Sequence, residues 1–194
     1  WILPLSSSLY LFFIYIFNKL KMHFFKFLVG SVGLFCFAVY FGKGMLVGPF
    51  SYLVAYIVKL FENVFHFYKT SPMHSVVTVY HKQQAVSFII DYECSGYIEA
   101  AVYSSALWFY PIYSVYEKAF NTVFGLVCIF GANVIRILFI AILVHIFGRN
   151  VLFISHTILA RLLFFIIMII LYYIVFTKPH ILRQKVGSFR YDDH

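Results

Sequence analysis

One cysteine of this chain lies in a segment with the chemistry of a reactive thiol. Cys94 belongs to a polar stretch, residues 91–97, between a β-branched segment and a long apolar one. The thiolate is the nucleophilic form of cysteine, so a catalytic cysteine needs a base or a nearby cation that lowers its pKa. The small residues Ser95 and Gly96 that follow would let a substrate backbone approach. Cys94 is therefore the candidate nucleophile.

Two later apolar stretches carry polar residues that can serve such a thiol. Asn133 and Arg136 lie three residues apart in one stretch, and His156 lies early in the next. Ionisable groups inside an apolar segment of membrane length are costly and usually functional. We expect His156 to act as general base and then general acid, and Arg136 to stabilise the thiolate or an oxyanion. Asn133, one helical turn from Arg136, is expected to orient the arginine or bind substrate backbone.

The carboxylates near Cys94 are expected to have a supporting role. A negative charge beside a thiol raises the pKa of that thiol, which opposes activation. Glu93 and Glu99 are therefore expected to position Arg136 or the substrate. An ion pair between Arg136 and Glu99, or with a lipid phosphate, is the plain structural alternative to a catalytic arginine.

Two further basic residues lie near the candidate base. His145 competes with His156 for the role of base, and a hydrogen bond between helices is the structural alternative for either histidine. Arg161 follows His156 by five residues, which places it about 140° away on an ideal helix. That angle favours a packing or counter-ion role for Arg161.

The composition places most of the chain in a membrane. Of its 194 residues, 63% are hydrophobic and only 11% charged, and the mean hydropathy is +0.89. Apolar runs of about 20 residues suffice to cross a hydrocarbon core of about 30 Å as helices. Because these runs are apolar on all sides, they do not suit barrel strands, whose lumen positions are polar. We expect an all-α polytopic membrane protein with about five transmembrane helices, or at most six.

The expected spans follow from hydropathy and the basic loops between them. They are residues 3–17, 27–41, 94–113, 120–142 and 151–176. The basic segments 19–26 and 178–190 are cytoplasmic by the positive-inside rule. This topology predicts a multi-pass cell-membrane protein whose candidate site lies at the extracytoplasmic face and whose basic C-terminus is cytoplasmic.

The outer segment between the second and third spans is expected to hold two small elements. Gly42, Gly44 and Gly48-Pro49 predict a turn, after which residues 50–67 form an amphipathic helix in the outer interface. Residues 75–80 and 85–90 are β-branched runs, so they predict a β-hairpin just before Cys94.

No cofactor or second domain is expected. The three cysteines form no Cys-x-x-Cys pair, and the proposed chemistry uses neither a metal nor an organic cofactor. The net charge of +8 falls in clusters beside apolar runs, which indicates lipid headgroups and not nucleic acid as partners. We expect one domain, 1–194, with a core at 50–176 and a basic tail at 177–194. The apolar run at Trp1 lacks a basic segment before it, so we do not interpret it as a signal peptide.

The ordered motifs resemble those of the exosortases and archaeosortases, and most of all the Gram-positive exosortase G subgroup. The match consists of Glu93-Cys94-Ser95-Gly96, then Asn133-Val134-Ile135-Arg136, then His156, within residues 50–176. The resemblance implies a membrane-embedded cysteine peptidase or transpeptidase. Its substrates would be exported proteins with a C-terminal sorting tail, made of a short motif, a transmembrane helix and a basic cluster. It also implies transfer of the acyl group from the cysteine to a surface acceptor.

Two other functions remain open from the sequence. A small transporter or channel could line its pathway with Asn133, Arg136 and His156, and it would have no need of Cys94. A non-catalytic scaffold for a membrane glycosyltransferase or polymer exporter would tolerate replacement of Cys94, Arg136 and His156.

Overall fold

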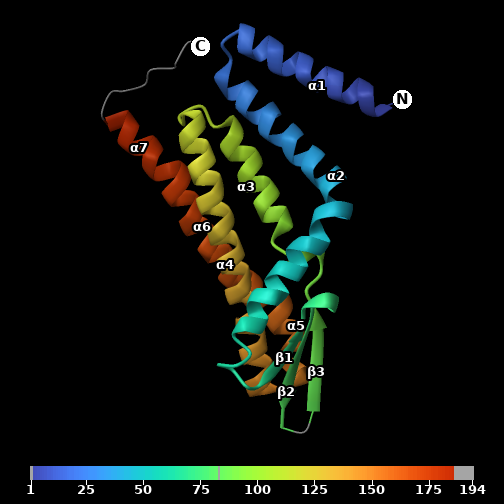
Figure 1. Ribbon diagram of the computed structural model, residues 1–194. Helices are drawn as coiled ribbons and strands as arrows, with labels where there is room; N and C mark the ends of the chain where they lie inside the picture. Colours follow the sequence, from blue (N-terminus) through green and yellow to red (C-terminus); the bar gives the residue numbers. More distant parts are fainter. Residues whose placement is uncertain (1, 83, 186–194) are drawn as a thin grey trace.

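The computed structural model describes residues 2–82 and 84–185, which are mostly helical with one small sheet. Figure 1 shows long helices running alongside one another, with the sheet at the end opposite to α1. Three helical runs are long and apolar enough to cross a membrane: His23–Leu60, Val115–Phe147 and Arg149–Leu182. The chain is thus a membrane-associated helical protein, and the expected count of about five spans is not confirmed.

The expected turn in the first third of the chain is wrong, and the predicted helix at residues 50–67 is not a separate element. After α1 (Ile2–Lys19), a single helix, α2, runs without interruption from His23 to Leu60 and contains Pro49. Figure 1 shows α2 changing direction part-way along its length. Proline inside a helix removes one backbone hydrogen bond and bends the helix, so the residues that predicted a turn produce a bent helix instead.

One glycine of the expected turn serves helix packing. A Cβ on Gly42 would lie 1.9 Å from the hydroxyl of Tyr97, which donates a hydrogen bond to the carbonyl of Ala38 at 2.5 Å. The absence of a side chain at Gly42 therefore lets α3 approach α2 closely. Farther along α2, Val54 and Val58 are buried against the rest of the molecule.

The predicted β-hairpin is confirmed and has a third strand. Strands β2 (Val76–His81) and β3 (Gln84–Ile89) pair antiparallel, with Val76 opposite Ile89. Strand β1 (Tyr68–Ser71) adds to the free edge of β2, after which the one-turn helix η1 (Pro72–His74) leads into the hairpin. β1 has only four residues, so its alternation of buried and exposed positions was too short to be recognised.

Helix α3 (Tyr97–Phe109) is shorter than the expected third span. Its 13 residues extend about 20 Å, less than the roughly 30 Å of a hydrocarbon core. Helix α4 (Val115–Phe147) is longer than expected because a capping box of Ser114 and Glu117 begins it early. α3 is thus too short to cross a membrane by itself, and it packs beside the much longer helices α2 and α4.

The last helical run includes two wider turns. After the short turn η3 (Arg149–Val151), it comprises α5 (Leu152–Ile154), η4 (Ser155–Leu159), α6 (Ala160–Tyr172), η5 (Tyr173–Thr177) and α7 (Lys178–Lys185). Both η4 and η5 are π-helical turns. The run includes the expected span 151–176 and continues into the predicted basic tail, of which residues 186–194 lie outside the described residues.

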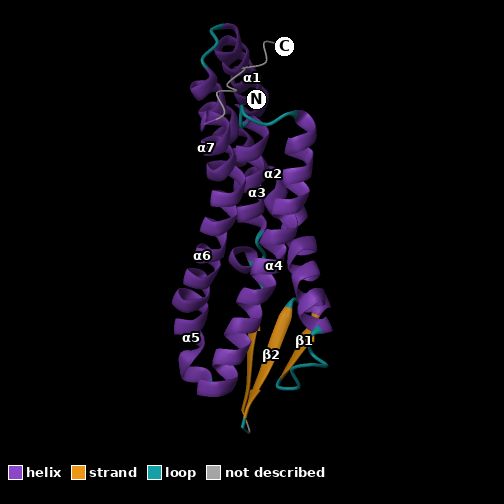
Figure 2. Ribbon diagram, turned by 90° about the vertical axis from the view of Figure 1, so that its left-hand side faces the viewer, coloured by secondary structure: helices purple, strands orange, loops and turns teal. Residues whose placement is uncertain are grey.

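The two ends of the molecule differ in what they contain. The connections α1–α2 and α3–α4 and helix α7 lie at one end, and the sheet and the α4–α5 connection lie at the other (Figures 1 and 2). The hydroxyl of Tyr110 donates to the carbonyl of Phe176 at 3.0 Å at the first end. Nδ1 of His81 donates to the carbonyl of His145 at 2.6 Å at the second. The loops predicted to be cytoplasmic therefore share one end.

The sheet belongs to the main hydrophobic core. Buried residues of β2 and β3, such as Val77 and Phe88, pack with Val54 of α2 and Ile137 of α4. Cys94 lies in the same core. The sheet therefore fixes the segment that carries the thiol between two long helices.

Candidate functional site

Three residues that are far apart in the sequence meet at the Cys94 thiol. Cys94 ends the one-turn helix η2 (Tyr92–Cys94), between the sheet and α3. Its Sγ lies 3.1 Å from Nε2 of His156, which is 62 residues later. Nη2 of Arg136, 42 residues after the cysteine, donates to the same Sγ at 3.5 Å. The structure thus brings together the nucleophile, base and cation named from the sequence.

His156 is presented by a π-helical turn. It is the second residue of η4, where the backbone N–H of Ala160 donates to the carbonyl of Ser155, five residues earlier. Single π-turns are rare and often occur at functional sites. The ring of Phe88 from β3 packs against the imidazole, with 6.4 Å between ring centroids. The sheet and the turn together hold the imidazole beside the thiol.

Arg136 is buried on α4, with only 3% of its surface exposed. Its guanidinium lies over the ring of Phe164 from α6, 5.7 Å from the ring centroid. A cation over an aromatic face gains electrostatic stabilisation, more so away from water. The arginine is therefore held in a fixed place, which is what electrostatic stabilisation of a developing charge requires.

Asn133 contacts the backbone of the candidate nucleophile. Its Nδ2 donates to the carbonyl of Cys94 at 2.5 Å, and its Oδ1 is buried without a hydrogen-bond partner among the described residues. Gly96 adopts φ +76°, and a Cβ there would lie 3.4 Å from this Nδ2. A residue with a side chain would be strained in this conformation, so glycine is needed for the chain to turn against Asn133.

Ser95 organises the same turn. Its hydroxyl donates to the carbonyl of Tyr92 at 3.0 Å and accepts from the backbone N–H of Tyr97 at 3.2 Å. Ser95 and Gly96 are both buried, so these small residues shape the turn and do not face open space. The side chain of Glu93 lies outside the described part of the chain.

Burial and nearby charges set the protonation state of the thiol. Cys94 lies outside the three membrane-length helices, and burial raises its pKa to about 11. The guanidinium of Arg136 opposes this rise, whereas the carboxylate of Asp91 adds to it and shares a hydrogen bond with the thiol. The resting group is therefore a thiol, and a reaction as nucleophile would require a base, for which the imidazole of His156 is within reach. Asp91 was not singled out from the sequence, because its approach depends on the η2 turn.

Arg161 lies closer to the site than its sequence spacing predicted. It lines the cavity that Arg136 also lines, and its positive charge lowers the pKa of Cys94. The predicted angle of about 140° from His156 assumed an ideal α-helix. In the π-turn, backbone hydrogen bonds join residues that are five positions apart. Residues with that spacing, such as His156 and Arg161, therefore lie nearer to the same face of the helix.

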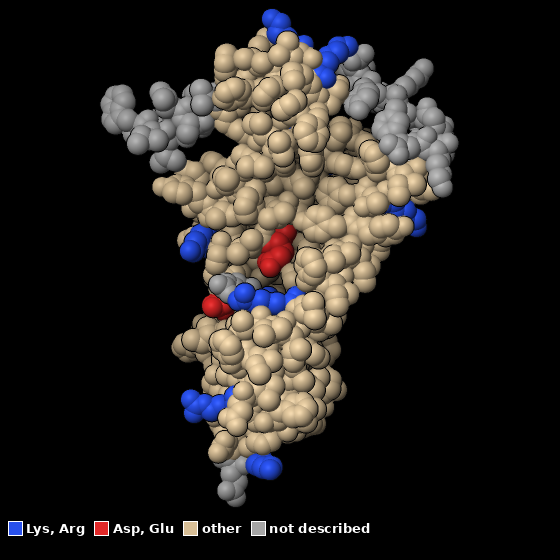
Figure 3. Space-filling view, turned by 180° about the vertical axis from the view of Figure 1, so that it is seen from behind, with Lys and Arg blue, Asp and Glu red and all other residues tan. Residues whose placement is uncertain are grey.

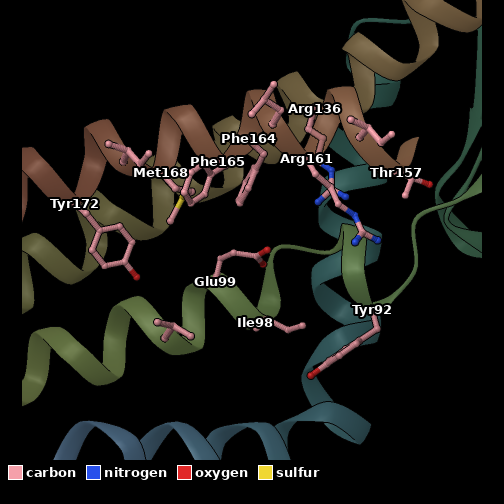
Figure 4. A pocket seen from close by; sticks show the side chains of 14 residues that line it. Tyr92, Ile98, Glu99, Arg136, Thr157, Arg161, Phe164, Phe165, Met168 and Tyr172 are labelled. Atoms are coloured by element: carbon pink, nitrogen blue, oxygen red, sulfur yellow. The ribbon is translucent and has the colours of Figure 1, made fainter. Parts of the chain in front are cut away.

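A cavity of about 970 Å³ opens next to the thiol between α3 and the final helical run. Figure 3 shows a hollow in a largely apolar face, with an acidic side chain inside it and basic side chains beside it. Figure 4 shows Glu99 and Arg161 pointing into this space from opposite walls. Its described lining includes Tyr92, Arg136 and Thr157, but neither Cys94 nor His156. Arg136 therefore links the cavity to the buried thiol.

The competing base, His145, lies elsewhere. Its Nδ1 donates to the carbonyl of Tyr80 at 2.6 Å, and its ring stacks on that of Phe67 at 4.5 Å. These contacts fasten the end of α4 to the sheet. Of the two histidines, it is His156 whose ring nitrogen reaches the Cys94 sulfur.

Comparison with known proteins gives no match: no family model, curated protein or solved structure resembles the chain closely enough. Within the described residues, no group of three or more His, Cys, Asp and Glu side chains is arranged to hold a metal ion.

The raised pKa predicts how Cys94 reacts with an alkylating reagent. In a chain carrying Cys36→Ser and Cys128→Ser, alkylation by iodoacetamide should quicken about tenfold per pH unit between roughly pH 7 and pH 9, because only the thiolate reacts. Removing a cation that lowers the pKa raises it, so Arg136→Gln should slow alkylation at every pH in this range. Mass spectrometry of the modified peptide measures the rate.

Arg149→Gln supplies the control for this experiment, because Arg149 is an exposed arginine of η3 at the sheet end. It should leave the pH profile unchanged. A rate that is independent of pH, or faster alkylation in Arg136→Gln, would contradict the predicted protonation state.

Proposed function

We propose that this chain is a membrane-embedded cysteine peptidase or transpeptidase that acts on C-terminal sorting signals of exported, membrane-anchored proteins. The supporting observation is the convergence on one buried sulfur of an imidazole at 3.1 Å and a guanidinium at 3.5 Å. A nucleophile beside a base and a fixed positive charge is the arrangement that acyl transfer needs. The resemblance of the motifs to the exosortases and archaeosortases supports the same activity.

In the proposed reaction, His156 removes the thiol proton as Sγ attacks the carbonyl carbon of the scissile peptide bond. Arg136 stabilises the resulting negative charge, first on sulfur and then on the carbonyl oxygen. Collapse of the tetrahedral intermediate breaks the C–N bond, and His156 protonates the leaving amine. Water or a surface acceptor then attacks the thioester, which releases the acyl group and restores the thiol. No step in this proposal requires a metal or organic cofactor.

The neighbouring polar residues have positioning roles in this proposal. Asn133 holds the carbonyl of Cys94, and Ser95 and Gly96 shape the turn that aims the sulfur. Glu93, which precedes Cys94 in the sequence, is proposed to position Arg136 or the substrate, because a carboxylate next to a thiol opposes its activation.

The proposal also assigns an orientation and partners. The sheet end would lie at the extracytoplasmic side and the basic C-terminus in the cytoplasm, in keeping with the positive-inside rule. Membrane lipids surround the helices, and the substrates are proteins with a tail made of a motif, a transmembrane helix and a basic cluster. A membrane glycosyltransferase is a further proposed partner.

Trapping the acyl-enzyme tests the proposal directly. A candidate membrane protein with a C-terminal sorting tail would be co-expressed with this chain, and the products separated without reducing agent. We expect a covalent adduct that neutral hydroxylamine releases, because hydroxylamine cleaves thioesters. A substrate that is shortened without a hydroxylamine-sensitive adduct on Cys94, under conditions that trap one in a known thiol transpeptidase, would count against the mechanism.

The two rival functions make different predictions for the same variants. A transporter that uses Arg136 and His156 would keep its flux in Cys94→Ala, and a scaffold would keep partner assembly in variants of all three residues. The contacts to the sulfur favour the enzyme, because neither rival gives Arg136 and His156 a reason to converge on a thiol.

A further inference from the structure

The cavity beside the thiol has apolar walls and opens to the side of the helical bundle. Helix α3 forms one wall, α6 forms the other, and Arg136 of α4 reaches it from behind. Most of the lining is apolar: Ile98, Val102, Leu162, Phe165, Met168 and Ile169. Phe165 and Ile169 are also exposed on the outer surface of α6, where lipid would surround them. The space suits an apolar occupant that enters from the membrane.

One carboxylate interrupts these apolar walls. Glu99, the third residue of α3, projects into the cavity between the end marked by Tyr92 and the end marked by Tyr172 (Figure 4). Its own backbone N–H donates to the carboxylate. The positive charge of Arg136, which lines the same cavity, acts on this carboxylate. Because the guanidinium of Arg136 also donates to the Cys94 thiol, the carboxylate of Glu99 can accept a further cation from a bound molecule.

The position of Arg136 connects this cavity to the proposed reaction. The same guanidinium contacts Sγ of Cys94 and lines the cavity. If Cys94 attacks a peptide bond, the residues on one side of that bond must therefore lie along the cavity. This inference rests on the proposed function, under which the molecule that occupies the cavity is a segment of a substrate protein.

We infer that the groove between α3 and α6 binds an apolar segment next to the scissile bond, and that Glu99 pairs with a basic side chain within that segment. Arg136 and Arg161 lie toward the Tyr92 end in Figure 4, so they repel a second cation there. The basic side chain of the substrate is therefore placed nearer to the Tyr172 end of the groove than the scissile bond is. Glu99 is a specificity-determining residue that selects among apolar segments by charge.

Photo-crosslinking with synthetic peptides tests this pairing without the natural substrate. The probes are leucine-alanine peptides of about 20 residues, long enough to cross a bilayer, each with a photoreactive diazirine. They carry lysine, glutamine, leucine or glutamate at one of several depths. With the full chain in phosphatidylglycerol nanodiscs, we expect lysine peptides to crosslink to α3 or α6 at least about tenfold more than leucine peptides, the scale of one charged hydrogen bond. Mass spectrometry locates the crosslinks.

Two substitutions at Glu99 test the role of its charge. Glu99→Gln keeps the size of the side chain and should remove the preference for lysine, whereas Glu99→Lys should shift it to glutamate peptides. Glu62→Gln is the matched control, because Glu62 accepts a hydrogen bond from the backbone of Thr70, outside the groove. It should keep the preference for lysine.

The outcomes separate this inference from the proposed function. Crosslinking needs no thiol, so Cys94→Ala should bind lysine peptides as the intact chain does. Absence of a lysine preference, a preference that survives Glu99→Gln, or crosslinks outside α3 and α6 would overturn the inference and leave the Cys94 chemistry standing. Loss of crosslinking only in phosphatidylethanolamine nanodiscs would show that an amine lipid occupies the groove, and would overturn it too. Substrate processing that persists in Cys94→Ala would instead overturn the proposed function.

Discussion

Cells that carry Cys94→Ala are expected to leave a tail-bearing substrate at full length, whereas cells with the intact chain shorten it. Alanine removes the sulfur that forms the thioester in the proposed mechanism, and loss of a nucleophile typically costs more than about a thousandfold in rate. Cys94 is fully buried, and alanine deletes one sulfur without adding bulk. We therefore expect normal expression of the variant. Immunoblotting of the substrate and of the chain measures both quantities together.

The other two cysteines provide matched controls for this experiment. Cys36 is exposed on α2 and Cys128 is half-buried on α4, so both lie on other elements than the η2 turn that carries Cys94. Cys36→Ala and Cys128→Ala should process substrate at the normal rate. Processing that continues in Cys94→Ala would sink the cysteine mechanism and favour a transporter or scaffold.

His156→Ala is expected to slow acyl transfer by about 10²- to 10⁴-fold, the usual range for a general acid–base group. The effect should be large because burial keeps Cys94 protonated, with a pKa raised to about 11, so the thiol depends on a neighbouring base. Raising the pH should recover part of the lost rate in His156→Ala, since hydroxide then forms thiolate that the imidazole no longer provides. Initial rates of processing in membranes, measured between roughly pH 7 and pH 9, report both the loss of rate and its recovery.

His145→Ala is the matched control for the imidazole. His145 stacks on Phe67 and bonds to the carbonyl of Tyr80, so its loss should affect the attachment of the sheet more than the chemistry. We expect lower thermal stability with a normal pH profile. Equal losses of rate in the two histidine variants, with the same pH profile, would show that His156 is not the base.

Much of the site and part of the fold could be predicted because they depend on local patterns. The alternation of β-branched residues in 75–90 indicated the hairpin, and hydropathy indicated the long helices, since both signals arise within a few residues. Cys94 stood out as a reactive group in a polar segment, and Arg136 and His156 stood out as ionisable groups that are costly in apolar segments. Their residue types carried the information, so no contact was needed to name them.

The errors arose where a distant part of the chain changed the meaning of a local signal. Gly42 and Pro49 indicate a turn in isolation, but Gly42 receives the ring of Tyr97 and Pro49 is tolerated in a bent helix. An angle of about 140° between His156 and Arg161 holds for an ideal α-helix, whereas a π-turn separates these two residues. No hydropathy pattern signals a π-turn, because it is stabilised by packing around it.

The sequence by itself determined that the chain is a membrane-associated helical protein with a hairpin before a thiol. Composition and periodicity suffice for this, because they decide which segments prefer lipid or water whatever the rest of the chain does. It also determined which side chains were chemically unusual. Only the tertiary structure decided that Asn133 holds the carbonyl of Cys94, that burial raises the thiol's pKa to about 11, and that Glu99 faces an apolar groove. These properties depend on distances between elements tens of residues apart, which packing fixes and a linear pattern does not contain.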